Sequence, residues 1–135
     1  MTTPWLDANV ILRFLTGDPE ELAERSRRLM ARAENAELAL YVSELVLAEV
    51  VWVLKSFYRH STSEIAEVIG ALVSAPGIRV DDRETTLRAL ELARDLNVDY
   101  LDAVLALQAA ARDETVCTFD ETDFKRLPAR WLSPE

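Results

Sequence analysis

The chain has 135 residues, half of them apolar and 29% charged, which suffices for one domain with a core of its own. The formal net charge of −9 argues against nucleic-acid binding through global positive charge. A single cysteine, Cys117, excludes an intramolecular disulfide, and no apolar run has the pattern of a signal peptide or the length of a membrane span. We therefore expect one cytoplasmic domain over residues 1–135 with no membrane contact.

Short apolar or β-branched runs alternate along the chain with longer segments of helical spacing. The expected strands are 5–7, 38–42, 78–80, 115–119 and 130–132. The expected helices are 9–15, 19–35, 44–58, a segment ending near 75–77, 83–96 and 100–112. This alternation predicts an α/β fold with three layers, α/β/α, around a short central parallel sheet. In such folds, ligands bind beyond the carboxyl ends of the strands.

Several helix starts carry capping signals. Asp18 followed by Pro19 predicts an N-cap and a first helical residue. Ser43 is expected to cap the helix from residue 44, and Asp99 the helix from residue 100. The intervening helix is expected to be capped by Ser61 or Ser63.

Four carboxylates end or interrupt the apolar segments: Asp7, Glu49, Asp102 and Asp120. A carboxylate in apolar surroundings is costly unless it is paired or bound to a metal. Because each stands at the edge of an element that looks buried, we expect all four to meet at one rim of the sheet. Oxygen ligands of this kind suit Mg²⁺, with Mn²⁺ as an alternative.

Each carboxylate also has a purely structural interpretation. Asp7 and Asp120 could be N-caps, and Asp102 could complement a helix dipole. Glu49 could lie on a solvated stripe, although the helix around it is apolar on nearly every side. The common rim, and no single residue, favours the shared metal site.

Four segments of the chain, taken together, resemble the signature blocks of the PIN-domain ribonucleases, in particular the VapC-type toxins of bacterial toxin–antitoxin pairs. They are LDANVILRFL (6–15), LVLAEVVWVL (45–54), VDYLDAVLA (98–106) and CTFDETDFKRLP (117–128). Their order, and their spread over almost the whole chain, also match that family. The resemblance implies a single PIN-like domain with metal-dependent endoribonuclease activity.

Carried over by position, the resemblance implies that the catalytic metal ligands are Asp7, Glu49, Asp102 and Asp120. Asp123 is a second acid in the last block, and either it or Asp120 contacts the metal. The resemblance also implies supporting polar roles for Asn9, Ser43 and Thr118. The partners that it implies are an RNA substrate, a cognate antitoxin and a second copy of the chain. Operator DNA would be bound by the antitoxin and not by this chain alone.

The chemistry needs no neutral base, since a water on a divalent cation is acidic enough to attack phosphorus. Arginines at the rim, Arg13 among them, could offset phosphate charge, and the group Arg25, Arg27, Arg28 and Arg32 could be a solvated face or a phosphate-contacting one. Two alternatives remain open. One is a receiver-like or phosphatase-like protein phosphorylated on Asp7, and the other is a catalytically silent PIN-like binding module.

Overall fold

The computed structural model describes residues 3–135, which form two compact units. The first unit runs to Arg83 and the second from Glu84 to the end of the chain. Both combine helices with a pair of short parallel strands, so the α/β class predicted from the sequence is confirmed. Among the described residues, no helix is long and apolar enough to cross a membrane.

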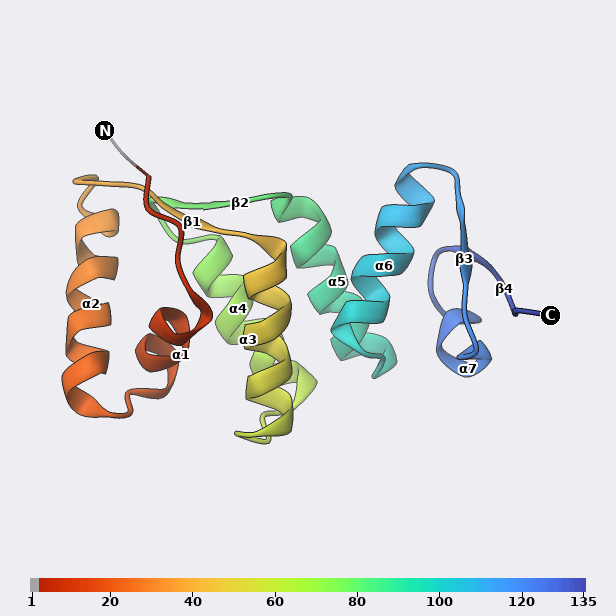
Figure 1. The fold of residues 1–135 in the computed structure, drawn as a ribbon, viewed down its shortest axis with the longest axis horizontal. Helices are drawn as coiled ribbons and strands as arrows, with labels where there is room; N and C mark the ends of the chain where they lie inside the picture. The colour runs from red at the N-terminus through yellow and green to blue at the C-terminus, as the bar shows by residue number, and fades with distance from the viewer. Residues whose placement is uncertain (1–2) are drawn as a thin grey trace. The chain divides into compact units, whose positions relative to one another are not determined.

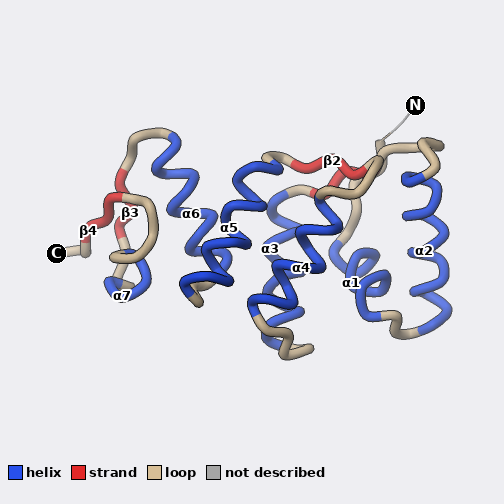
Figure 2. The backbone as a smooth tube through the Cα atoms, turned by 180° about the vertical axis from the view of Figure 1, so that it is seen from behind, coloured by secondary structure: helices blue, strands red, loops and turns tan. Residues whose placement is uncertain are grey.

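The first unit contains four helices and one strand pair (Figure 1). Its elements are α1 (Ala8–Thr16), α2 (Glu20–Glu34), β1 (Leu40–Val42), α3 (Glu44–Ser56), α4 (Thr62–Val73) and β2 (Ile78–Val80). β1 and β2 pair in parallel, and residues 4–6 run beside β1 through one bridge between Trp5 and Tyr41. The four helices lie to one side of these strands in Figure 2. Leu40, Val42 and side chains of α1, α3 and α4 form the buried core.

The second unit carries the remaining helices and the other strand pair. Its elements are α5 (Arg83–Leu96, whose first residue ends the first unit), α6 (Tyr100–Ala111), β3 (Thr115–Cys117), α7 (Glu121–Phe124) and β4 (Arg130–Leu132). β3 and β4 pair in parallel, and α6 packs against both β3 and α7. Phe124 of α7 and Val98 before α6 are almost fully buried, which fixes the short helix in place.

Most of the predicted caps are present. Ser43 Oγ accepts a hydrogen bond from the backbone N of Val46 at 3.3 Å, at the start of α3. At the start of α4, Ser61 and Glu64 form a reciprocal capping box, which decides between the two serines considered. Asp99 accepts from the backbone N of Leu101 at 3.0 Å, at the start of α6.

The prediction of Asp18 as an N-cap is wrong. Pro19 has an extended backbone with ψ 152°, so it is itself the N-cap, and α2 begins one residue later at Glu20. Three predicted strands are shorter than expected: residues 5–7 contribute only the bridge at Trp5, β1 begins at Leu40, and β3 ends at Cys117. Cys117 is exposed, because only Val116 in β3 points into the core.

Candidate metal centre

Three carboxylates of the second unit meet at one point. Oxygen atoms of Asp102, Asp120 and Asp123 all lie within 4.8 Å of one another. Asp102 and Asp123 are half-buried, whereas Asp120 is exposed. The structure thus brings together Asp102 of the third sequence block and both aspartates of the fourth.

Local backbone geometry explains how these three side chains come to face each other. Asp102 sits in the first turn of α6, whose start Asp99 fixes. Asp120 is the N-cap of α7, and its Oδ1 accepts from the backbone N of Asp123 at 3.0 Å. The turn before it is held by Thr118, whose Oγ1 accepts from the backbone N of Asp120 at 2.9 Å. The capping role of Asp120 is therefore real, and it aims the carboxylate at the cluster.

Arg126 is a part of this cluster that the sequence reasoning missed. Its Nη2 contacts Asp123 Oδ1 at 2.8 Å, and its Nη1 donates to the carbonyl of Leu96 at the end of α5. The guanidinium therefore offsets one of three negative charges and ties α7 to the corner that leads into α6. The i,i+3 spacing of Asp123 and Arg126 was the available signal.

The donor set fits a hard divalent cation. Carboxylate oxygens are the ligands that Mg²⁺ and Mn²⁺ prefer. Two oxygens on opposite sides of one Mg²⁺ are about 4.2 Å apart, because each lies about 2.1 Å from the ion. The oxygens of the cluster lie within 4.8 Å of one another, which is only slightly more, so small side-chain rotations would bring them to coordinating distance from one ion. The Oδ1 atoms of Asp120 and Asp123 accept hydrogen bonds, and each carboxylate has a second oxygen besides.

The other two predicted ligands belong to the first unit. Asp7 occupies the N-cap of α1, yet its side chain makes no capping hydrogen bond, so capping does not account for this carboxylate. Glu49 lies in the middle of α3. Both side chains are exposed. Their participation in a metal site with the second unit stays a prediction from the sequence.

The start of α3, the helix that carries Glu49, is held by the residue that follows β2. Asp81 Oδ2 accepts from the backbone N of Glu44 at 2.7 Å, and Asp81 Oδ1 accepts from the hydroxyl of Tyr41. This hydrogen bond to Asp81 raises the pKa of Tyr41 above its usual value, because it stabilises the protonated phenol. Trp5 stacks on the same ring, with 4.3 Å between centroids.

The argument from burial was wrong for most of these acids. Asp7, Glu49 and Asp120 are exposed, so desolvation of these carboxylates is not a reason to expect a bound cation. Around Glu49, the apolar residues of α3 do not cover it on all sides: Leu45 is 82% and Trp52 61% exposed. The core face of α3 consists only of Leu47, Val50, Val51 and Leu54. Proximity of like charges, and not burial, marks the cluster in the second unit.

The predicted supporting residues differ in what they contact. Thr118 contacts the backbone of Asp120, as described above. Ser43 caps α3 and is half-buried. Asn9 is exposed in the first turn of α1 and lines a cleft between α1 and α2.

Comparison with known proteins covers nearly the whole chain. The VapC ribonuclease of Aquifex aeolicus (strain VF5) is 25% identical over 130 residues, which is 96% of this chain and 95% of that protein. A chain in the crystal structure of VapBC2 from Rickettsia felis, bound to a DNA fragment from their promoter, aligns at 21% identity with a TM-score of 0.40, covering 99% of this chain and 100% of that one. A sequence model described as the PIN domain matches residues 5–130. That match runs from the bridge at Trp5 to the first residue of β4 and takes in every candidate ligand, and the chain therefore belongs to the PIN domain family.

Proposed function

We propose that this chain is a metal-dependent endoribonuclease, which hydrolyses phosphodiester bonds of RNA. The observation that carries the proposal is the cluster of Asp102, Asp120 and Asp123, whose oxygens lie within 4.8 Å of one another in a chain of the PIN domain family. The similarity to the VapC ribonuclease of Aquifex aeolicus supports the choice of RNA as substrate. Mg²⁺ is the proposed cation, with Mn²⁺ as a substitute.

The proposed site assigns ligand, proton-accepting and positioning roles to different residues. Asp102, Asp120 and Asp123 would hold the cation, and Asp7 and Glu49 are proposed as further ligands on the strength of the sequence resemblance. The chemistry that a divalent cation would supply there is a water made acidic enough to attack, and neutralisation of charge on the phosphate oxygens. Carboxylates that do not contact the cation directly can accept the proton of the attacking water. Thr118 and Arg126 would keep Asp120 and Asp123 in place.

Cleavage of a single-stranded RNA tests this proposal. The purified chain should cut it with Mn²⁺ or Mg²⁺ and not with EDTA, and Asp102→Asn and Asp7→Asn should each lose activity. Asp99→Asn is the matched control, because it removes one charge from an N-cap of the same unit and leaves the carboxylate cluster intact. Full activity of Asp102→Asn in a clean preparation would falsify the proposal.

The two alternatives give different outcomes in the same preparation. A receiver-like or phosphatase-like protein would form an acyl-phosphate on Asp7, which adds the mass of a phosphoryl group after incubation with a phosphoryl donor. A silent binding module would retain RNA without cutting it and would show no heat of metal binding. The nuclease gives neither result.

The wider role follows from the same resemblance. We propose that the chain acts in the cytoplasm as the toxin of a toxin–antitoxin pair, is held inactive by a cognate antitoxin, and forms a homodimer. In this view the antitoxin, and not this chain, contacts operator DNA. Co-expression with a small neighbouring reading frame, followed by co-purification and mass measurement of the assembly, tests the pairing and the dimer together.

A further inference from the structure

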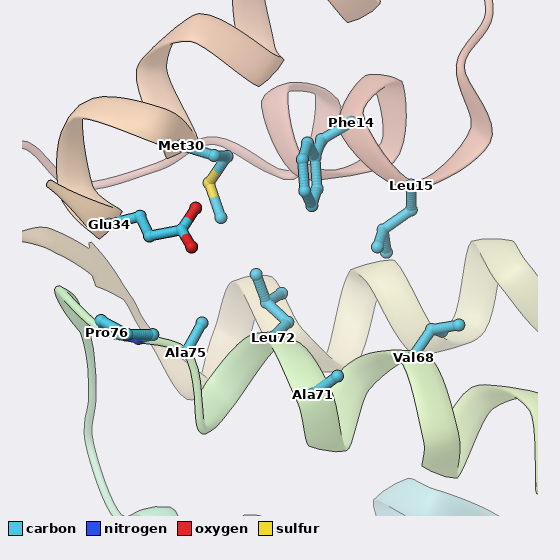
Figure 3. Close-up of a pocket in the computed structure, with 9 residues that line it drawn as sticks. All are labelled: Phe14, Leu15, Met30, Glu34, Val68, Ala71, Leu72, Ala75 and Pro76. Carbon is cyan, nitrogen blue, oxygen red and sulfur yellow. The ribbon is translucent and has the colours of Figure 1, made fainter.

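Helices α1 and α2 of the first unit border two clefts of opposite character. One, of about 360 Å³, opens toward α4 and is apolar (Figure 3). Phe14 and Leu15 face Leu72 across it, and Glu34 is the only charged residue among those that line it. This cleft offers nothing to an anion.

The other cleft, of about 480 Å³, lies between α1 and α2 alone and carries positive charge. Its lining combines two arginines, two short polar side chains and three apolar ones, with no acid among them: Asn9, Val10, Arg13, Leu22, Arg25, Ser26 and Leu29. In a chain with 24 acidic and 15 basic residues, a cleft lined by two arginines and no carboxylate is a local reversal of charge.

Neither arginine of this cleft has a carboxylate partner in the part of the chain that the structure describes. Arg13 donates only to the carbonyl of Asp18 at 3.3 Å, and Arg25 forms no ion pair there. Arg27, by contrast, is neutralised on the same helix by Glu20 at 2.5 Å and Glu24 at 2.9 Å. Guanidinium groups without a partner keep their planar set of donors available for an anion of matching shape.

The cleft begins where a proposed catalytic residue stands. Asn9, which lines it, is two residues after Asp7, the N-cap of α1. Arg13 is a further turn along, about 6 Å from Asn9 along the helix axis, because a helix rises about 1.5 Å per residue. Asp7 itself does not line the cleft, because side chains two positions apart on a helix do not share a face. A strand of RNA that is cut beside Asp7 would reach the cleft by passing around the first turn of α1.

We propose that the α1–α2 cleft binds the phosphodiester backbone of single-stranded RNA beside the cut, with Arg13 and Arg25 each contacting a phosphate. This inference rests on the proposed ribonuclease function and extends it to a binding site. Asn9 adds a side-chain amide, and the apolar residues Val10, Leu22 and Leu29 offer a surface for ribose and base faces. Because phosphate contacts carry no sequence information, the cleft contributes affinity and orientation but no sequence preference.

The dependence of RNA affinity on salt tests the proposal. Labelled single-stranded RNA is titrated with the Asp102→Asn protein between about 50 and 200 mM KCl, and log Kd is plotted against log salt concentration. Each phosphate contact on a single strand contributes about 0.7 to the slope, so Arg13→Gln with Arg25→Gln should reduce its magnitude by about 1.4. The loss of affinity should be the same for RNAs of different sequence. Arg13→Lys with Arg25→Lys keeps both charges and should restore most of the slope.

The matched control is Arg59→Gln with Arg79→Gln. Both residues are exposed arginines of the same unit that form no ion pair among the described residues, and neither lines the cleft. This variant changes the net charge by the same amount and should leave the slope within about 0.3 of the parent protein. A circular-dichroism spectrum and a thermal melt show whether each variant is folded.

Three outcomes would overturn the proposal in distinguishable ways. If the chain cuts RNA but the cleft variant and the control have equal slopes, the cleft is not the phosphate site while the ribonuclease function stands. If the cleft variant keeps its RNA slope but loses affinity for poly-glutamate, the cleft binds an acidic protein segment instead. If the parent chain neither binds nor cuts RNA, both proposals fail.

Discussion

Asp120→Asn should stabilise the metal-free protein and weaken its response to a cation. Asn is as good an N-cap as Asp, so the hydrogen bond from the backbone N of Asp123 at 3.0 Å should survive. The change removes one of the three negative charges whose carboxylate oxygens lie within 4.8 Å of one another. Relief of repulsion should raise the stability of the folded protein, whereas loss of a ligand should lower the stability that a bound cation adds. The first effect should dominate without a cation and the second with Mn²⁺ present.

The size of each effect follows from the geometry. Two unit charges 4.8 Å apart in water repel by about 0.9 kcal/mol, and water is the appropriate medium because Asp120 is exposed. Asp120 has two such neighbours, one of which is partly neutralised by Arg126, so we expect a gain of about 1 kcal/mol at low salt. For a chain of this length that gain raises the melting temperature by roughly 3 °C.

With Mn²⁺ the order of stabilities should reverse. At about a hundredfold excess over Kd, a cation stabilises the folded state by about 2.7 kcal/mol. If the variant binds about 10-fold to 100-fold more weakly, its gain under the same conditions falls to about 0.4–1.4 kcal/mol. Thermal melts of both proteins in EDTA and in MnCl₂, at low ionic strength, measure all four values. Asp99→Asn is the control, since it makes the same change at another N-cap.

Two results would refute this reasoning. If Asp120→Asn is less stable than the parent in EDTA, the three carboxylates do not repel one another in the folded protein. If it keeps the full Mn²⁺-induced shift, Asp120 is not a ligand and the last block acts through Asp123 alone.

Two further predictions concern the scaffold of the first unit. Gly77→Ala should lower the free energy of unfolding by more than about 2 kcal/mol, because the φ of Gly77 is +78° and a Cβ there would lie 2.5 Å from the carbonyl oxygen of Ala33. Gly17→Ala should lower it by only about 1 kcal/mol, because the φ of Gly17 is +73° but the space around it is open; equal losses measured by urea unfolding would contradict this prediction. Hydrogen bonds that the Glu64 carboxylate accepts from the backbone N and the side chain of Ser61 lower the pKa of Glu64 below its ordinary value. The stabilising effect of Glu64 is therefore present above that ordinary value and disappears as the pH falls through the lowered pKa. The difference in melting temperature between the parent and Glu64→Gln should therefore shrink over that pH range, and a constant difference would argue against the capping box.

Local signals in the sequence predicted most of the elements. N-cap residues with short-range hydrogen bonds, such as Ser43 and Asp99, act within a few positions of the helix that they begin, so the sequence alone suffices to find them. The second half of α3 shows where such reasoning ends. The large apolar side chain of Trp52 is typical of a core residue, yet it is 61% exposed. Tertiary packing, which the local sequence does not show, decides which apolar side chains are buried.

The candidate metal centre was also predicted only in part, because some of its contacts are local in sequence and others are not. Asp120 caps α7 and Asp123 lies within it, and α6 packs against that helix, so the sequence blocks that supply these acids lead directly to the cluster with Asp102. Arg126 was not foreseen, since its second contact, the carbonyl of Leu96, is 30 residues away. Asp7 and Glu49 lie in the other compact unit, so their role as ligands remains a prediction.

Cation binding by the clustered carboxylates is the central claim, and an anomalous difference map tests it most directly. Crystals grown with MnCl₂ should show a peak at coordinating distance from oxygens of Asp102 and of at least one of Asp120 and Asp123. The same map reports whether Asp7 and Glu49 are ligands too. Manganese peaks elsewhere in the crystal, with none at these carboxylates, would contradict the claim.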